Sequence, residues 1–232
     1  HEPGLMDMDV AAIHLGFLRG FRRAGGVLAC DSRVAGIERR AGAWHVACGA
    51  ERFEAPLLVD AAGAWADEVA ALAGVAPIGL VPRRRTAILV DPPAALAGGI
   101  ATMPAIDFAG SDAYLKPDAG QVMASPGDET PVAPQDVQPE ELDVATIVDV
   151  LEQRTQLRPR RVARAWAGLR SFVADRVPVV GFDPLADGFF WLAGQGGFGI
   201  MMAPALAEAA AALVRDDRLS RALADAGVGA GD

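Results

Sequence analysis

The feature that most constrains this fold is a glycine-rich turn close to the C-terminus. Gly194, Gly196 and Gly199 form a G-x-G-x-x-G pattern within FFWLAGQGGFGIMM, directly after an apolar run. A strand, a tight turn and a helix in that order are typical of nucleotide-binding units. The 33 residues after Gly199 are polar or helical in pattern and contain no apolar strand. Because an ADP site needs a second parallel strand that ends in an acid, the pattern fails as an ADP site.

Two other interpretations of the glycine turn remain open. The glycines can be structural, because they allow tight packing where a Cβ would not fit. Alternatively, the helix that follows the turn presents free N–H groups, which stabilise partial negative charge on any ligand. The reduced ring of a flavin carries such charge at its N1–C2=O edge.

Composition bounds the class of protein. The 232 residues are enough for one large domain or two small ones, and the formal net charge of -9 argues against a nucleic-acid partner. The sequence contains no uninterrupted run of 18 apolar residues, so no membrane span is expected, and no secretion signal is visible at its start. Cys30 and Cys48 are too far apart for the C-x-x-C pattern of metal or redox motifs, so we expect them to be buried thiols. We therefore expect a cytoplasmic globular protein.

The first third of the chain predicts an α/β arrangement. A helix is expected over residues 9–23, with Asp9 as its N-cap and Gly25 and Gly26 at its end. VLACD (27–31) predicts a short buried strand, and a meander of short strands is expected up to residue 55. Another strand (57–59) leads to a turn at Gly63. The helix after this turn is expected to pack through its large apolar side chains, which are Trp65, Val69 and Leu72.

The composition of the chain changes at Pro77, where prolines, glycines and short β-like pieces become frequent. One helix, predicted for residues 140–156, interrupts them, and the α/β pattern of the first third returns near Trp166. These changes predict three segments: 1–76 and 166–232 in one domain, and 77–165 in another.

Four stretches together resemble the FAD-dependent D-amino-acid oxidase family, which also contains glycine and sarcosine oxidases. They are LLVDAAGAWADEVAALAG, YLKPDAGQVMASPGDETPVAPQDVQPEELD, WAGLRSFVADRVPVVGFDP and GFFWLAGQGGFGI. Within the family, the last three are most similar to the D-arginine dehydrogenases. The resemblance implies an α/β fold in which the C-terminal portion of a Rossmann-type FAD-binding domain (1–76 and 166–232) is interleaved with an α+β substrate domain built on an antiparallel sheet (77–165).

The family carries its ADP-binding G-x-G-x-x-G before anything present in this chain, which begins HEPGLM. We therefore expect a piece of a longer enzyme. The alternative is a truncated, non-catalytic α/β chain that needs a partner segment to bind FAD.

The resemblance also implies a substrate site. Arg170, in WAGLRS, matches the arginine that grips the substrate carboxylate, for which a guanidinium fork is well suited. Tyr114 matches a substrate-contacting tyrosine, and Gly168 matches a backbone position beside the substrate. Arg85 is expected to be a second carboxylate-binding arginine, with Arg84 as the alternative.

The cofactor positions follow from the same resemblance. Val34 matches a residue whose backbone meets the adenine, and Ala62 and Gly63 match the turn that passes the FAD. The flavin-facing turn comprises Gly194, Gln195, Gly196, Gly197, Phe198, Gly199 and Ile200.

The implied reaction oxidises the Cα–N bond of an amino acid or related amine by hydride transfer to flavin. It gives an imine, which water converts to a 2-oxo acid and ammonia, and it requires no protein base. The electron acceptor is left open between O₂ and a quinone. No metal-ligand motif, P-loop or nucleophile elbow appears in the sequence, so no metal is expected.

Overall fold

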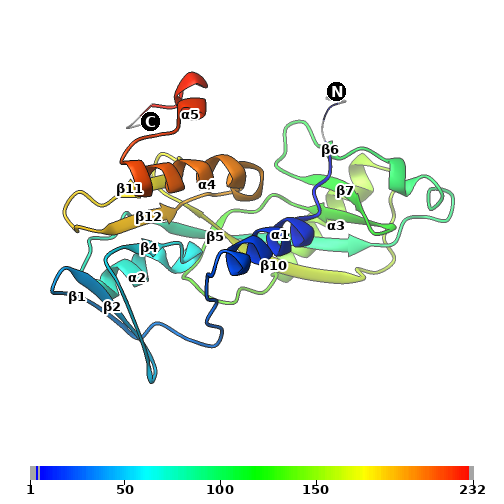
Figure 1. The fold of residues 1–232 in the computed structure, drawn as a ribbon. Coiled ribbons are helices and arrows are strands. Elements are labelled where there is room, and N and C mark those ends of the chain that lie inside the picture. Colours follow the sequence, from blue (N-terminus) through cyan, green and yellow to red (C-terminus); the bar gives the residue numbers. More distant parts are fainter. Residues whose placement is uncertain (1–3, 5, 230–232) are drawn as a thin grey trace.

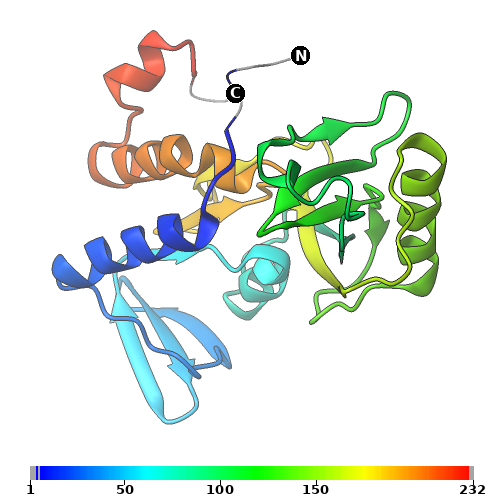
Figure 2. The same cartoon turned by 90° about the vertical axis from the view of Figure 1, so that its right-hand side faces the viewer.

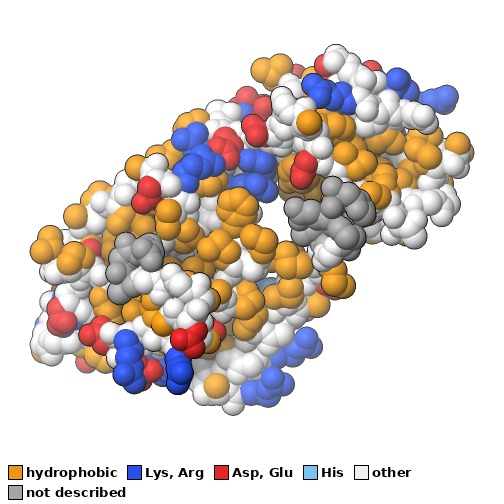
Figure 3. Space-filling model, turned by 90° about the horizontal axis from the view of Figure 1, so that it is seen from above, with side chains coloured by type: hydrophobic (Ala, Val, Ile, Leu, Met, Phe, Trp, Pro, Cys, Tyr) orange, Lys and Arg blue, Asp and Glu red, His pale blue; other side chains and the backbone are white. Residues whose placement is uncertain are grey.

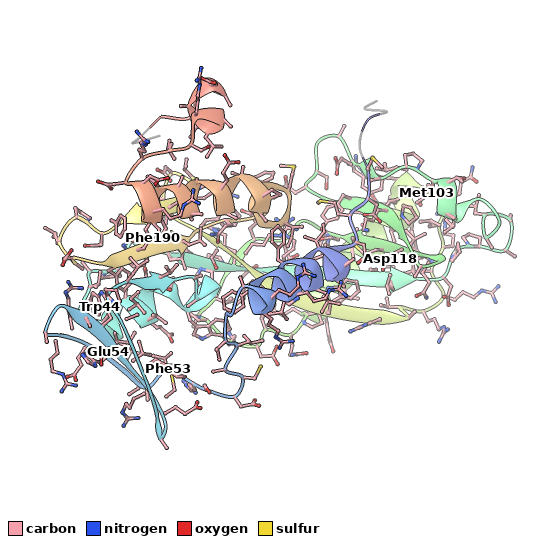
Figure 4. All side chains as sticks on the ribbon, in the orientation of Figure 1. Trp44, Phe53, Glu54, Met103, Asp118 and Phe190 are labelled. Atoms are coloured by element: carbon pink, nitrogen blue, oxygen red, sulfur yellow. The ribbon has the colours of Figure 1, made fainter. Side chains whose placement is uncertain are left out.

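A computed structural model describes residues 4 and 6–229 of the chain. Its elements gather at two ends, as Figure 1 shows. A six-stranded sheet with α3 forms one end, and a three-stranded sheet with α2, α4 and a β-meander forms the other. Trp44 and Phe190 belong to the second end, and Met103 and Asp118 to the first (Figure 4).

The six-stranded sheet runs in the order β10-β5-β8-β7-β6, with β9 also paired to β5, and every pair in it is antiparallel. Its strands are β5 (Val81–Val90), β6 (Ile106–Asp107), β7 (Tyr114–Asp118), β8 (Gln121–Ser125), β9 (Thr130–Pro131) and β10 (Arg164–Phe172). A short 3₁₀ turn, η2 (Ile100–Thr102), lies between β5 and β6. The antiparallel sheet predicted for the middle of the chain is therefore present.

One face of this sheet is closed by α3 (Glu141–Arg154), which lies along the sheet in Figure 2. Side chains on a strand alternate between faces, so Ile88 and Val90 point to the same side of β5. Both are fully buried with Ile147 and Leu151 of α3. Leu142, near the start of the helix, is 74% exposed.

The three-stranded sheet runs β11-β12-β4, and β12 and β4 are parallel. Its strands are β4 (Leu58–Asp60), β11 (Val179–Phe182) and β12 (Phe189–Ala193). The predicted meander is β1 (Gly36–Arg40), β2 (Ala43–Cys48) and β3 (Glu51–Ala55). A second hydrophobic cluster joins these pieces, with Trp44 against the Phe189 ring at 5.8 Å between centroids.

The helices of this end match the sequence pattern in part. α1 (Val10–Arg23) begins after Asp9, whose side chain accepts from the Ala12 N–H at 2.8 Å, as predicted. The 3₁₀ turn η1 (Gly63–Trp65) leads into α2 (Ala66–Leu72). α2 buries the small residues Ala66 and Ala70. Of the large apolar side chains predicted to pack, Val69 contacts the second hydrophobic cluster, whereas Trp65 and Leu72 are each 42% exposed.

The strand predicted for residues 27–31 is absent. This segment has no regular structure, and Val27 is 80% exposed. A strand needs a hydrogen-bonded neighbour, and no described strand lies along this segment. The segment is apolar enough for a strand, but its pairing partner is not among the described residues.

The chain closes with α4 (Gly199–Asp216) and α5 (Arg221–Asp225). Much of the upper surface of the molecule is hydrophobic (Figure 3). Large apolar side chains of α1 and of the start of α4 are exposed, among them Phe17 at 58% and Met201 at 63%. Within residues 4 and 6–229, no helix has the length and apolarity needed to cross a bilayer.

Candidate active site

Strand alternation brings the predicted substrate residues to one face of the six-stranded sheet, opposite α3. β5 and β10 pair so that Arg85 faces Gly168 and Arg83 faces Arg170. These four positions therefore share a face. Gly168 has open space where a Cβ would stand, so the backbone of β10 is accessible beside Arg85.

Arg84 lies on the other face of β5 and is 4% exposed. Its guanidinium contacts Asp143 at 3.0 Å between Nη2 and Oδ2, and it also contacts Glu140 and Asp128. These carboxylates compensate the buried charge, as burial of an arginine requires. Of the two arginines that the sequence left open, Arg85 is the one on the side of Arg170.

Tyr114 is half-buried on β7, opposite Ser125 of β8. It lies near enough to Arg85 to affect the pKa of that guanidinium. Burial lowers the pKa of Arg85, and the charge of Arg170 lowers it further, while Tyr114 and Glu129 act in the opposite direction. The structure thus brings Arg85, Arg170 and Tyr114 into one electrostatic neighbourhood.

Arg170 joins this neighbourhood to the glycine turn. Within the described residues, its guanidinium forms no ion pair and no hydrogen bond to a side chain. A Cβ added at Gly197 would stand 2.9 Å from Arg170 Nη1. The missing side chain at Gly197 is therefore what allows the arginine to lie against the turn.

The turn has the geometry that its glycines predict. Gly194 and Gly196 have φ of +74° and +55°, which side-chain-bearing residues rarely adopt. α4 begins at Gly199, and its N-cap Phe198 supplies no side-chain hydrogen bond. The N–H groups of the first helical turn therefore have no partner within the helix and no side-chain cap.

A largely apolar pocket of about 570 Å³ lies over this helix start. Its lining comes from α1, β10, the glycine turn and α4: Phe17, Arg170, Leu192, Gln195, Gly196, Gly197, Gly199, Ile200, Ala203, Leu206 and Ala207. One face of the pocket is thus apolar, and the other offers backbone N–H groups and a guanidinium.

The other predicted cofactor positions lie apart from this pocket. Gly63 (φ +60°) and Ala62 follow β4, and the parallel pairing of β4 with β12 puts this turn at the same sheet edge as Gly194. Val34 lines a separate surface pocket with residues of α2. Beside Ala62, burial raises the pKa of Asp60 to about 6, although its Oδ1 accepts from the Ala62 N–H at 3.1 Å.

Sequence reasoning missed two charged residues of the site, Glu129 and Arg176. Arg176 Nη2 contacts Glu129 Oε1 at 2.9 Å, and Arg85 Nη2 contacts the same oxygen at 3.1 Å. The Arg176 guanidinium also lies over the Phe172 ring, 4.0 Å from its centroid. Both residues are in irregular segments, where no periodicity signals which way a side chain points. Phe17 of α1 also lines the pocket, and no motif in the sequence marks it as a site residue.

No group of three or more His, Cys, Asp or Glu residues is placed to hold a metal ion in the part of the chain that the structure describes.

Comparison with solved structures gives the same overall fold. The chain is similar to L-proline dehydrogenase from P. horikoshii, with 23% identity and a TM-score of 0.75 over 90% of this chain and 56% of that one. It is also similar to glycine oxidase from Geobacillus kaustophilus, with 23% identity and a TM-score of 0.67 over 87% and 53%. The L-alpha-glycerophosphate oxidase from Mycoplasma pneumoniae, solved with FAD bound, matches at 19% identity and a TM-score of 0.66 over 79% and 50%. The chain thus spans about half the length of these proteins.

The mixed fold with antiparallel sheets expected from the sequence is confirmed by these likenesses. The family model DAO, described as "FAD dependent oxidoreductase", matches residues 1–213. The family depends on FAD, as the sequence predicted. The chain belongs to the DAO family of FAD-dependent oxidoreductases.

Proposed function

We propose that this chain forms the substrate-binding and flavin-ring side of an enzyme that oxidises the Cα–N bond of an amino acid. The candidate substrates are D-amino acids and glycine- or sarcosine-like amines. D-amino acids are included because three stretches of the sequence are similar to D-arginine dehydrogenases. The products are an imine and, after hydrolysis, a 2-oxo acid and ammonia. The observation that carries the proposal is the position of Arg170, which lies against the glycine turn and pairs with no acid among the described residues.

The pocket residues fit a flat ring with partial negative charge at one edge. Gly196 and Gly197 keep the turn open, because a Cβ at either position would meet Phe172 or Arg170. The N–H groups at the start of α4, which have no partner within the helix, are suited to the electron-rich edge of such a ring. FAD, when bound, supplies the hydride acceptor. Gly194 to Ile200 would hold its ring, with Ala62, Gly63 and Val34 toward the rest of the cofactor.

The side chains of the chain then hold and orient the substrate. Arg170 offers a bidentate fork to the substrate carboxylate. Arg85 approaches it from the paired strand β5, and Tyr114 lies farther along the sheet on β7, near enough to act on Arg85. Binding the carboxylate would position Cα over the pocket, and this orientation of the substrate would contribute to the rate of the reaction. Leu192, Leu206 and Phe17 supply the apolar part of the pocket lining. The amine must be neutral when it reacts, and this step needs no protein base.

We also propose the domain division 1–76 with 166–232, and 77–165. It is supported by the two hydrophobic clusters. The one around Ile88 and Ile147 draws only on the middle segment, and the one around Trp44 and Phe189 draws almost entirely on the outer segments.

A second candidate is a non-catalytic chain that binds FAD only with a partner segment. It is favoured by the exposed apolar side chains of α1 and by the segment at Val27, which pairs with no described strand. Absorption spectra of the purified chain with added FAD separate the two candidates. A chain that stays colourless would contradict independent catalysis.

The reaction is tested on the full-length, FAD-bound polypeptide. Anaerobic mixing with D-amino acids, glycine, sarcosine and proline is expected to bleach the flavin with at least one of them, and the 2-oxo acid is then measured. If no amino acid bleaches a flavin that dithionite reduces normally, the proposal is wrong. Repeating the turnover with O₂ and with a soluble quinone identifies the electron acceptor.

A further inference from the structure

Positive charge gathers at one end of the open face of the six-stranded sheet. Arg83 and Arg85 alternate along β5, and Arg170 stands directly across from Arg83 on β10. Arg176 follows β10 and shares Glu129 with Arg85. These four arginines form a locally basic group in a chain whose formal net charge is -9.

Glu129 alone does not balance this arginine cluster (Arg83, Arg85, Arg170 and Arg176). Both of its carboxylate oxygens accept from Arg176, and one also accepts from Arg85. Arg83 reaches only the backbone oxygen of Glu129, at 3.0 Å from Nη1. The other nearby acid, Asp128, accepts from the N–H and hydroxyl of Thr86 and lies 3.7 Å from Arg84 Nε. Asp128 acts on the charge of Arg85 as well, but it is shared with Arg84, so Glu129 and Asp128 together offset only part of the positive charge of the cluster.

Asp107, a further acid on this face, is too distant to help. Asp107 pairs with Tyr114 on the edge strand β6. The sheet order puts β6 three positions from β5, which is about 14 Å at the usual strand spacing. A charge that far away and exposed to water is largely screened.

The cluster also leaves donors unused. Arg83 Nε and Arg85 Nε are buried, and neither has a hydrogen-bond partner in the described part of the chain. The Arg85 side chain is only 13% exposed. Like charges directly across a strand pair, such as Arg83 and Arg170, destabilise a sheet unless an anion lies between them. Buried donors without partners cost free energy, which a bound acceptor recovers.

We propose that the substrate carries two carboxylates, as in a dicarboxylic amino acid or an N-carboxymethyl amine. This inference rests on the proposed function, because it takes Arg170, Arg85 and Tyr114 as the site of the α-carboxylate. The second carboxylate then lies toward the guanidinium of Arg83, whose described polar contact is with the backbone oxygen of Glu129. With Glu129, one α-carboxylate offsets two of the four arginine charges, and a second carboxylate offsets a third. A cationic side chain would add to the charge of the cluster.

Steady-state kinetics of the full-length FAD-bound polypeptide test the substrate class. Iminodiacetate, D-aspartate and D-glutamate are compared with sarcosine, D-alanine and D-arginine. The best dicarboxylate is expected to have a KM at least about tenfold below that of the best monocarboxylate, as one additional charge-assisted contact provides. Arg83→Gln should abolish this advantage while changing the monocarboxylate KM less than about twofold, and Arg83→Lys should restore part of it. Equal KM values, or a preference for D-arginine, would overturn the inference while leaving the proposed function intact.

Calorimetric titration with malonate and with acetate separates failure of the inference from failure of the proposed function, because it needs no turnover. Malonate is expected to bind at least about tenfold more tightly than acetate. Arg83→Gln should remove the difference, and the matched control Arg161→Gln, an exposed arginine paired with Asp91, should keep it. If no amino acid reduces the flavin but malonate binds in this way, the proposed function is wrong and the dianion site stands. If malonate and acetate bind equally, the dianion site is wrong. Thermal melting of each variant shows that a loss of binding is not a loss of fold.

Discussion

Strand β5 turns Arg84 and Thr86 to one side of the six-stranded sheet, and Arg83 and Arg85 to the other. On the side closed by α3, Arg84 contacts three carboxylates, and Thr86 is fully buried with both its N–H and its hydroxyl bonded to Asp128. On the open side, two buried guanidinium nitrogens lack partners among the described residues. Neighbouring arginines therefore differ in their surroundings: the closed side completes its polar contacts within the fold, and the open side leaves two nitrogens without a partner among the described residues.

The largest effect is expected from Arg84→Ala on the closed side. It leaves the nearly buried Asp128 and Asp143 without their counter-ion, and breaking such a group typically costs about 3–5 kcal/mol of unfolding free energy. Urea unfolding measures the loss. Arg161→Ala, which breaks an exposed pair, is the control and should cost less than about 1 kcal/mol. Similar small losses in both variants would mean that the closed-side network does not stabilise the sheet.

Packing should show the same contrast in adjacent residues. Ile88 is fully buried beneath α3, and Ile88→Ala is expected to cost about 2–5 kcal/mol through lost burial and a cavity. Leu89 points to the open side and is only partly buried, so Leu89→Ala should cost about 1 kcal/mol or less. The two unfolding curves give the difference directly. Equal losses would show that the open face is packed by something other than the described residues.

On the open side, Arg170→Ala should impair substrate use and leave stability nearly unchanged. Loss of a charge-assisted contact of about 1.5–3 kcal/mol lowers kcat/KM for carboxylate substrates roughly 10- to 150-fold. The unfolding free energy should change by less than about 0.5 kcal/mol, because Arg170 has no acid partner to lose within residues 4 and 6–229.

Arg164→Ala is the matched control for Arg170. It removes an exposed arginine from the same strand and the same face, six residues or about 20 Å away. Its kcat/KM should match that of the wild type. A parallel loss in both variants would indicate a general electrostatic effect and would remove Arg170 from direct contact with the substrate.

The sequence predicted the elements of this site better than their orientation. The apolar run, the glycines and the helix from Phe189 to Val214 are local signals, and the structure has the strand, turn and helix where they indicate. The local sequence RRRT does not show whether Arg84 or Arg85 lies on the same face as Arg170. That depends on which face of the sheet α3 covers, which is a property of the tertiary structure. Glu129 could not be predicted as a partner of Arg85, because it lies in an irregular loop where no hydrophobic periodicity indicates the direction of a side chain.

The failed strand at residues 27–31 shows a different limit. VLACD has the composition of a strand, but pairing depends on a neighbour, and the described residues supply none. The prediction for α2 was correct only for Val69, which packs against the cluster around Phe189. The fully buried positions are Ala66 and Ala70, because close approach to that cluster selects small side chains. Composition indicated the potential for structure, while packing partners decided the outcome.

The smallest expected effect concerns Glu129, the acid on the open side. Its hydrogen bonds with Arg176 hold the pKa of this carboxyl below its ordinary value of 4.5. A lowered pKa stabilises the fold above the ordinary value, and the contribution is lost as the pH falls through the lowered one. Because the pair is partly exposed, Glu129→Gln should cost less than about 1 kcal/mol at pH 7, and the difference from wild type should vanish as the pH falls below 4.5.

Urea unfolding of wild type and Glu129→Gln between about pH 3 and pH 7 measures this dependence, with the exposed Glu152→Gln as control. A loss of several kcal/mol at pH 7 would make the open side as dependent on internal ion pairs as the closed side, and the contrast between the two faces would fail. A loss below about 1 kcal/mol, together with altered carboxylate binding, would mean that Glu129 acts mainly by holding Arg85 and Arg176 in place. The two faces would then differ as the unpaired nitrogens indicate: the ion pairs of the closed face stabilise the fold, and the arginines of the open face bind an anion.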